Sequence, residues 1–284
     1  MPTLRELLQE YKGAGRAVGH FNISDSNQLQ AVAGAAKETG LPVVVGLSEG
    51  EREFFPITHA RALIDLYRAQ GIQIYLNADH TYTIDKVQHA IADGVDSVVV
   101  DGAKLVFEEN AHLLNTAVTY ARASGRDVLV EGELGYIGSS SNVMEALPEG
   151  AAITEDMMTK PDELRALVEQ TGIDLVAPAV GNIHGIVTSG QPKLSIERIK
   201  TLKEAVSVPL VLHGGSGSPD EEFAQAVKAG IVMIHINTDL RVLYRDTLKT
   251  TLSGQETTPY KFLTPAVVAM QAYMAQKMAL FANR

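Results

Sequence analysis

Short apolar runs rich in β-branched residues alternate with longer amphipathic stretches along the chain. The apolar runs are typical of strands buried on both faces of a parallel sheet, and the amphipathic stretches are typical of helices that cover it. Strands are predicted over residues 17–23, 42–48, 73–80, 97–102, 127–135, 174–185, 209–217 and 233–238. Helices are predicted over 27–39, 57–70, 83–93, 108–124, 161–171, 196–206, 219–229 and 239–252, with a last one near 265–281.

This repeated strand–helix rhythm predicts an α/β fold, a single (β/α)8 TIM barrel over residues 1–284 with a C-terminal helical extension. An open, doubly wound sheet has the same alternation and remains the alternative on periodicity alone. The polar residues favour the barrel, because every predicted strand ends in FN, LS, ADH, VDG, EGELG, GNIHG, HGGSG or INTD. A barrel brings all these ends to one face, whereas an open sheet joins only those near its switch point.

Residues 138–154 form a long connection after one of these polar strand ends. Their serine, asparagine, glycine and proline content predicts a mobile loop. A lid over the site and an ordinary surface insertion are both open interpretations. A second loop is predicted over residues 253–259.

Composition limits the class of protein. A chain of 284 residues with 45% hydrophobic and 20% charged residues can bury a large globular core. The net charge of −10 argues against a broad nucleic-acid-binding surface. The N-terminal residues lack the pattern of a signal peptide and no apolar run reaches membrane-spanning length, so we expect a cytoplasmic protein without a membrane partner. The absence of cysteine excludes disulfides and thiolate ligands, which leaves histidine and carboxylate for any metal.

Three histidines lie at predicted strand ends: His80, His184 and His213. Neutral imidazole is a good ligand for Zn²⁺ and related divalent ions, and three protein ligands leave a position open for a substrate oxygen. The alternative is that each of these histidines has a structural role. Because all three fall at the face where barrel enzymes build their sites, we expect a divalent metal there.

Carboxylates occur beside these histidines. Strand alternation would turn Asp79 and His80 to opposite faces, but the rule relaxes at a strand end. Asp79 is therefore a candidate proton donor or acceptor, or else a helix cap or an orienting partner. Asp101, Glu131 and Glu133 are candidates to orient the histidines or to form an alternate metal position.

Two consecutive strand ends have features of an anion site. The first, HGGSGSP from His213, offers glycine amides and leads into a helix near Pro219. The second, Asn237-Thr238-Asp239, also enters a helix. Glycine turns and helix caps are common, but the loops after strands seven and eight often bind phosphate in such barrels. Together they predict a phosphate site.

The ordered landmarks FNI, ADH, VDG, VEGELG, GNIHG, VLHGGSG and NTD run along nearly the whole chain. In them the sequence resembles the class II ketose-bisphosphate aldolases, particularly the tagatose- and fructose-bisphosphate branch. The resemblance implies reversible cleavage of a phosphorylated ketose to dihydroxyacetone phosphate and an aldehyde. It also implies a divalent metal, Zn²⁺ or another ion, that polarises the ketone and stabilises the enediolate.

The resemblance also implies roles for individual residues. His80, His184 and His213 match the metal ligands, and Asp79 matches the acid/base at the substrate C4 hydroxyl. The residues that match the phosphate site are Gly185, Gly214, Ser216, Asn237 and Thr238. Asn22 and Ser48 fall where the family contacts substrate, and backbone groups near Gly181 and Ser216 match a Na⁺ or K⁺ site of several relatives. A homodimer or homotetramer is expected, with residues 262–281 either at the subunit interface or packed on the barrel.

Three departures from the family pattern concern the substrate. Ser141 stands where the family has a loop acid, with Glu145, Glu149 and Glu155 as replacement candidates. His235 replaces an asparagine that contacts the enediolate, and is a candidate substrate donor, acid/base or core histidine. Residues 258–261, Thr-Pro-Tyr-Lys, replace an Asp-Pro-Arg segment, so that only Lys261 could supply charge for a distal phosphate.

These departures favour an aldolase whose aldehyde half differs from glyceraldehyde 3-phosphate. The alternatives are a metal-dependent isomerase or epimerase of a sugar phosphate, and a non-catalytic aldolase-like subunit. Schiff-base chemistry needs a lysine at a strand end, and Lys104 lies just beyond one. A nicotinamide or flavin enzyme is disfavoured, because no strand is followed by a Gly-x-Gly-x-x-Gly turn.

Overall fold

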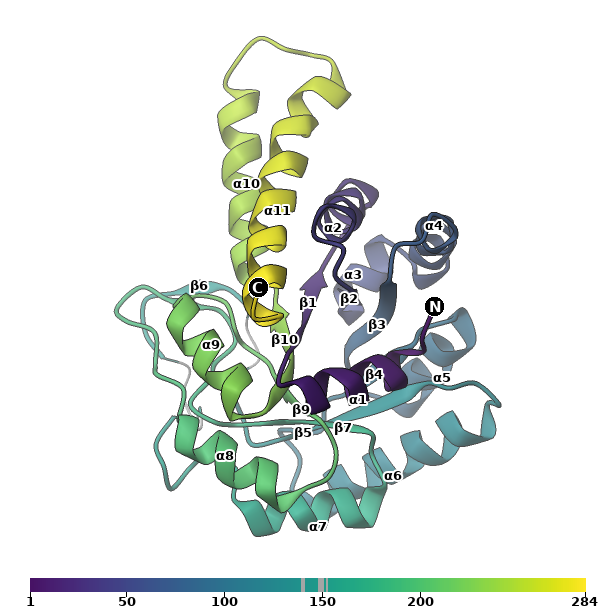
Figure 1. The fold of residues 1–284 in the computed structure, drawn as a ribbon, viewed down its shortest axis with the longest axis vertical. Coiled ribbons are helices and arrows are strands. Elements are labelled where there is room, and N and C mark those ends of the chain that lie inside the picture. The colour runs from purple at the N-terminus through teal and green to yellow at the C-terminus, as the bar shows by residue number, and fades with distance from the viewer. Residues whose placement is uncertain (139–140, 148–150, 152) are drawn as a thin grey trace.

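The structure is a computed structural model that describes residues 1–138, 141–147, 151 and 153–284. Within this part of the chain, eight parallel strands close into a barrel in the order β1-β10-β9-β7-β5-β4-β3-β2 (Figure 1). They are β1 (Val18–Asn22), β2 (Val43–Leu47), β3 (Ile74–Thr81), β4 (Ser97–Val100), β5 (Leu129–Leu134), β7 (Leu175–Pro178), β9 (Leu210–Leu212) and β10 (Ile231–Ile236). Pairing of β1 with β10 confirms the predicted barrel and excludes the open sheet.

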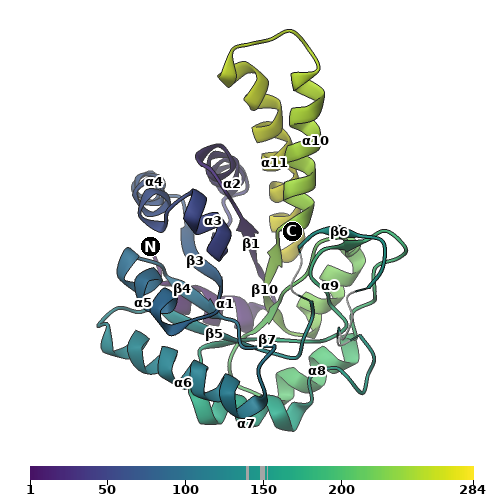
Figure 2. The same ribbon diagram turned by 180° about the vertical axis from the view of Figure 1, so that it is seen from behind.

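Helices surround this barrel (Figure 2). They are α1 (Leu4–Ala14), α2 (Ser26–Thr39), α3 (Glu49–Phe54), α4 (Ile57–Ala69), α5 (Ile84–Asp93), α6 (Phe107–Ala123), α7 (Pro161–Thr171), α8 (Ile196–Ala205), α9 (Asp220–Ala229), α10 (Thr238–Leu252) and α11 (Pro259–Phe281). Neither α1 nor α3 was among the predicted helices. Among the described helices, none has the length and apolar character needed to cross a membrane.

Helix α1 packs across the amino ends of the strands. Its buried face consists of Leu4, Leu7, Leu8 and Tyr11, and it belongs to one apolar cluster with residues from the starts of the barrel strands. Thr3 begins the helix through a capping box with Glu6, which satisfies the first free N–H groups. The helix therefore closes the barrel at the end opposite the polar strand ends.

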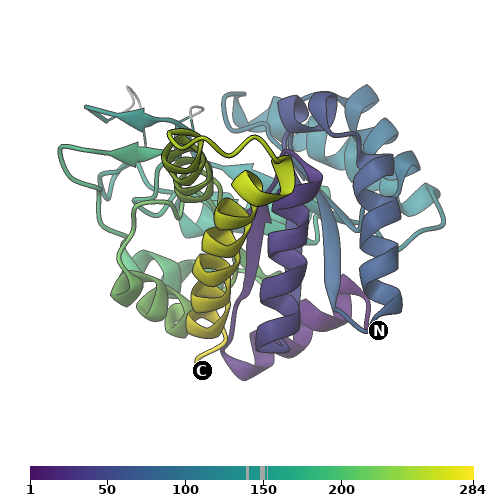
Figure 3. The same ribbon diagram turned by 90° about the horizontal axis from the view of Figure 1, so that it is seen from above.

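The C-terminal helices form a hairpin that projects from the barrel (Figure 1). Helix α11 lies beside α2 and contacts β1 and α10 (Figure 3). It begins at Pro259 rather than near residue 265, so the predicted loop ends one residue earlier, at 258. Proline is tolerated in the first turn of a helix because an N–H group at that position would have no intrahelical acceptor. The helix continues through Pro265.

Two predicted strands are too long. The strand predicted over 174–185 ends at Pro178, and the strand predicted over 209–217 ends at Leu212. Gly181 and Gly185 in the first segment have φ of 94° and 93°, and Gly214 and Gly217 in the second have φ of 62° and 81°. Strand geometry does not allow these values, so both segments are loops. Part of the long connection is ordered, because β6 (Val143–Met144) pairs with β8 (Ile186–Val187) in parallel.

We expect Leu7→Ala to lower the free energy of unfolding by about 2–5 kcal/mol, because it leaves a cavity beneath the barrel. Leu7 is 2% exposed, whereas Leu66 is 61% exposed. The matched control Leu66→Ala should change stability by less than about 0.5 kcal/mol. Urea unfolding followed by circular dichroism measures both. Equal stabilities of the two variants would show that α1 does not seal the core.

Candidate active site

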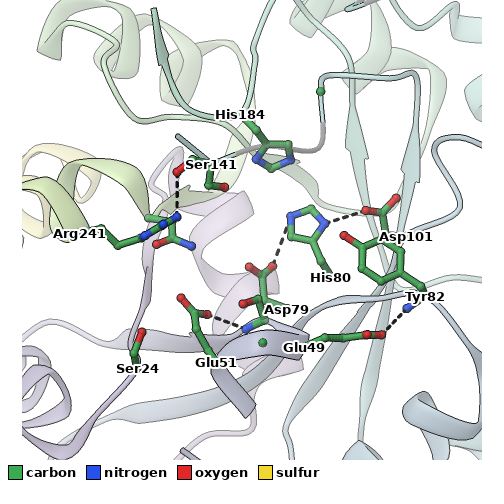
Figure 4. A pocket seen from close by; sticks show the side chains of 14 residues that line it. Ser24, Glu49, Glu51, Asp79, His80, Tyr82, Asp101, Ser141, His184 and Arg241 are labelled. Atoms are coloured by element: carbon green, nitrogen blue, oxygen red, sulfur yellow. Dashed lines mark hydrogen bonds and ion pairs between the residues drawn. The ribbon is translucent and has the colours of Figure 1, made fainter. Parts of the chain in front are cut away.

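Two adjoining cavities lie at the carboxyl ends of the barrel strands and share Asp79, His80, Ser141, His184 and Asn237. The main cavity has a volume of about 410 Å³ (Figure 4). Its lining residues are Ser24, Ser48, Glu49, Gly50, Glu51, Asp79, His80, Tyr82, Asp101, Gly138, Ser141, His184, Asn237 and Arg241. The inner cavity is about 20 Å³ and is lined by Asn22, Asp79, His80, Ser141, His184, Gly185, Gly214, Ser216, His235, Asn237 and Thr238.

The three histidines predicted as metal ligands meet at this face. Their ring centroids are 4.8 Å (His80–His184), 5.2 Å (His80–His213) and 5.9 Å (His184–His213) apart, with the rings edge-on. Glu133 joins them, and one ligand atom from each of the four residues lies within 4.8 Å of the others. Nε2 of His184 is buried without a hydrogen-bond partner among the described residues. An orphaned buried nitrogen in such a cluster fits a metal ligand.

Among the described residues, two other groups are close enough for a metal by distance alone: His20, Asp79 and His235, and Glu131, His213 and His235. In both, the histidine rings stack. The ring centroids of His20 and His235 are 3.5 Å apart with an interplanar angle of 6°, and those of His213 and His235 are 4.0 Å apart with an interplanar angle of 24°. Stacked rings direct their nitrogen lone pairs side by side, whereas rings at steep angles can direct them to one point. The cluster with Glu133 is therefore the better metal site.

The carboxylates predicted near the histidines contact them directly. Asp101 Oδ2 lies 2.9 Å from His80 Nδ1, and Glu131 and Glu133 lie 2.7 and 2.8 Å from the two nitrogens of His213. Burial by itself lowers the pKa of His80, but Asp79 and Glu133 outweigh it and raise the pKa to about 9. In the same way, Glu133 and Glu131 overcome burial and raise the pKa of His213 well above its ordinary value.

An irregularity in β3 lets two consecutive residues face the same cavities. The register with β4 shifts between Ala78 and Thr81, and His80 has a φ of 36°. A positive φ is strained for a residue with a side chain, and such bulges redirect side chains at functional sites. Arg52 of α3 holds the segment, because its guanidinium donates to the Asp79 carbonyl oxygen and to Thr81 Oγ1. Asp79 and His80 both reach the site for this reason.

Asp79 is buried between polar neighbours. Its Oδ2 accepts a hydrogen bond from Asn22 Nδ2 at 2.8 Å, and its Oδ1 lies 3.5 Å from His235 Nδ1. Burial would raise its pKa, but the charge of His80 and the contact with His235 lower the pKa well below its usual value. Asp79 is therefore an ionised carboxylate that can accept a proton.

The residues predicted to bind phosphate line the inner cavity together. They are Gly185, Gly214, Ser216, Asn237 and Thr238. Gly214 has a φ of 62°, and a Cβ there would lie 2.2 Å from the Ile183 carbonyl oxygen, so only glycine fits. Helix α10 begins at Thr238 and directs its N-terminal amides toward the same region.

Other predicted contacts differ in position. Ser48 lines the main cavity, and it begins α3 in a capping box with Glu51. Gly181 packs against the Lys193 backbone, where a Cβ would lie 2.4 Å from the carbonyl oxygen, and it lines neither cavity. The carbonyl of Ser216 accepts a hydrogen bond from Gln191 at 3.0 Å.

The candidates for a loop acid are largely outside the cavities. Glu155 lines neither cavity, and its carboxylate contacts Arg198 at 3.0 Å and Ser195 at 2.7 Å. Glu145 is exposed, and Glu149 lies outside the described residues. Ser141 lines both cavities, as its place in the family pattern predicted.

Lys261, the candidate to supply charge for a distal phosphate, lines neither cavity within this chain. Lys261 pairs with Glu256 at 3.2 Å, and Tyr260 beside it is 69% exposed. Both lie in the first turn of α11, at the outer end of the projecting hairpin (Figure 1). Sequence position alone could not show that this segment leaves the barrel.

Sequence reasoning missed several residues at the site. Glu51 accepts a hydrogen bond from Asn22 Nδ2 at 2.9 Å, and burial raises the pKa of its carboxyl group. The Ser-x-x-Glu pattern over 48–51 is a helix-start signal that could have identified it. Arg241 lines the main cavity and donates to the Ser141 carbonyl oxygen at 2.8 Å. His20, inside the barrel, carried no signal beyond its place in a strand.

Known proteins match this chain over almost its entire length. The family model for class II fructose-bisphosphate aldolase matches residues 2–284. The chain belongs to this family. It is 31% identical over 288 residues to the fructose-bisphosphate aldolase of Geobacillus stearothermophilus, covering 99% of this chain and 96% of that protein. The crystal structure of the YdjI aldolase from Escherichia coli K12 matches with a TM-score of 0.82 and 27% identity, covering 99% of this chain and 97% of that one.

A third relative supports the same assignment. The crystal structure of a putative fructose-1,6-bisphosphate aldolase from Coccidioides immitis matches with a TM-score of 0.84 and 25% identity, over 99% of this chain and 96% of that one. This class II aldolase is thus a carbon–carbon lyase of carbohydrate metabolism. It reversibly cleaves a phosphorylated ketose to dihydroxyacetone phosphate and an aldehyde, and it depends on a metal. The resemblance seen in the sequence is confirmed, and these relatives give no support to an isomerase or a non-catalytic subunit.

We expect the metal-free aldolase to release protons when it binds Zn²⁺ near about pH 7.5, because a ligand imidazole must be neutral. Below its raised pKa of about 9, His80 holds a proton without metal, and His213 does so as well. The number of protons released per bound Zn²⁺ should therefore fall as the pH rises through about 9. Calorimetric titration in two buffers of different ionisation enthalpy measures it, and equal heats in both would contradict this charge state.

Proposed function

We propose that His80, His184 and His213 hold one divalent cation, Zn²⁺ by preference, at the open end of the barrel. The observation that carries this proposal is the buried Nε2 of His184, which has no hydrogen-bond partner in the described part of the chain and lies beside two imidazole rings set edge-on. Zinc suits a site with imidazole and carboxylate ligands. Glu131 and Asp101 orient two of the rings, and Glu133 stands as an additional or alternate ligand. A bound cation supplies Lewis-acid polarisation of the substrate carbonyl.

Asp79 is the proposed acid/base at the hydroxyl group of the substrate beside the bond that breaks. Its carboxylate is ionised and borders both cavities, so it can take the hydroxyl proton during cleavage and return it during condensation. Asn22 orients this carboxylate through its amide hydrogen bond of 2.8 Å. His235 is the proposed hydrogen-bond donor to the substrate beside Asp79, because it lines the inner cavity.

The inner cavity is the proposed phosphate end of the site. Amides near Gly185 and Gly214, the Ser216 hydroxyl and the start of α10 at Asn237 and Thr238 surround it. Helix N-terminal amides and glycine-rich backbone bind phosphate without a cationic side chain. A Na⁺ or K⁺ beside the backbone of Ser216 and Gly181 is a finer proposal. It is supported by the Ser216 carbonyl oxygen, because the hydrogen bond from Gln191 uses only one of its two lone pairs and leaves the other for a cation.

The main cavity is the proposed site for the aldehyde half. Its wall opposite Arg241 carries Glu49, Asp101 and Tyr82 (Figure 4). A second phosphate there would meet carboxylates, and Lys261, which pairs with Glu256, does not line this cavity. We therefore propose a substrate whose aldehyde half differs from glyceraldehyde 3-phosphate and bears no phosphate.

We further propose a cytoplasmic homo-oligomer, a dimer or tetramer. Exposed apolar side chains on the α10–α11 hairpin support self-association: Leu252, Tyr260 and Val268 are 55%, 69% and 58% exposed. Phosphorylated sugars are charged and cross a bilayer poorly, so the enzyme is expected to lie in the compartment that holds them.

His184→Ala should lower metal affinity by more than roughly 100-fold, beyond the loss that follows removal of an orienting partner. The matched control is His112→Ala, because His112 is exposed on α6. Metal content after dialysis against a weak chelator, measured by atomic absorption, compares the two variants with the unsubstituted protein. Full metal occupancy in His184→Ala would remove this residue from the ligand set.

A cleavage assay over phosphorylated ketoses tests the aldehyde half. We expect kcat/KM for a ketose 1-phosphate to exceed that for fructose 1,6-bisphosphate by roughly tenfold or more, a barrier difference of about 1.4 kcal/mol. The acidic wall of the main cavity is the reason. Detection of dihydroxyacetone phosphate with a coupled dehydrogenase gives the rates. Highest activity on fructose 1,6-bisphosphate would overturn this part of the proposal.

A further inference from the structure

Three imidazole rings form a continuous stack inside the barrel. The ring centroids of His20 on β1 and His235 on β10 are 3.5 Å apart, and those of His235 and His213, just after β9, are 4.0 Å apart. His20 and His235 are register partners on neighbouring strands. His213 belongs to the proposed metal site and His235 lines the inner cavity. His20 has no place in the chemistry proposed above, although its side chain is completely buried.

The barrel is built to hold His20 in one orientation. Asn77 Nδ2 donates to Ser97 Oγ at 2.8 Å, which leaves Asn77 Oδ1 to accept from His20 Nε2 at 3.1 Å. Gly46 provides the space for the ring, because a Cβ there would lie 2.1 Å from His20 Cε1. One edge of His20 is thus fixed by a hydrogen bond, and its face is pressed against His235.

His235 lacks comparable anchors of its own. Neither of its nitrogens has a hydrogen-bond partner among the described residues, and the nearest carboxylate oxygen, Asp79 Oδ1, is 3.5 Å from Nδ1. The ring is nevertheless 6% exposed and lines the inner cavity. Its orientation therefore depends on the two rings that sandwich it. Stacked aromatic rings resist tilting, because tilting opens a void on one side and a clash on the other.

We propose that His20 is a positioning residue that sets the ring plane of His235. The stack directs the nitrogen edge of His235 toward Asp79 and toward the inner cavity, the proposed phosphate end of the site. This inference rests on the proposed function of His235 as a substrate hydrogen-bond donor. It differs from a second metal site at His20, Asp79 and His235, which would need the stacked rings to separate.

Proton exchange of dihydroxyacetone phosphate in D₂O tests the inference, because enediolate formation needs no aldehyde. Deuterium uptake is followed by ¹H NMR for the Zn²⁺-loaded enzyme and for His20→Gln, which keeps a polar partner for Asn77 but loses the ring. We expect the exchange kcat to fall roughly tenfold, as when a reacting group is slightly misplaced, with KM changed less than about threefold. His112→Gln, at an exposed position, is the control and should match the parent protein.

A double-mutant cycle separates positioning from general destabilisation. In a His235→Ala background, His20→Gln should change the exchange rate less than about twofold, because the ring that it positions is absent. Equal losses in both backgrounds would overturn the proposal, as would unchanged kcat in His20→Gln. Absence of exchange in the parent protein would instead overturn the proposed function, and this inference with it.

Two measurements do not depend on activity. A crystal structure of Zn²⁺-loaded His20→Gln should show the His235 ring turned away from Asp79, and an unchanged ring would overturn the proposal. Zinc content should be one ion per chain in both the parent protein and His20→Gln. Two ions in the parent and one in the variant would assign His20 to a second metal site instead.

Discussion

Mutual neutralisation of buried imidazoles and carboxylates at the carboxyl ends of the strands is the interaction on which this structure depends. Burying an ionised group in a barrel core is costly unless a partner of opposite charge or a hydrogen bond compensates. Here Asp101 faces His80, and Glu131 and Glu133 face His213. The same pairs that make the burial tolerable also fix the orientation of the rings at the proposed metal site. Stability and chemistry are therefore coupled at this face.

The site divides between strands and loops. The clustered histidines and the Gly214 turn are held by strand ends and by backbone conformations that admit little variation. The main cavity is bordered instead by α3, by the connection containing Ser141 and by Arg241 at the start of α10. Rigid strands suit groups that must meet within fractions of an ångström, whereas loops can vary with the substrate. This division is consistent with an ordinary class II metal centre beside an altered aldehyde end.

Much of the site could be predicted because each strand end is marked locally by a polar or glycine-rich segment. His80, His184 and His213 were identified in this way, and so was the Gly214–Ser216 turn. Helix α3 escaped prediction because it has only 6 residues and no buried apolar face, although Glu51 and Arg52 at the site lie on it. The position of Lys261 could not be predicted, because nothing local reveals that it lies on a helical hairpin that projects from the barrel.

By itself, the sequence predicted the barrel and the three histidines that meet at its open end, because hydrophobic periodicity and residue chemistry are local properties of the chain. Only the tertiary structure decided which neighbours each group has. The positive φ at His80, which accompanies the register shift that brings Asp79 into the site, arises from contacts between separate strands, and so does the stacking of His20 on His235. Such contacts depend on barrel closure and register, which determine distances that no local pattern contains.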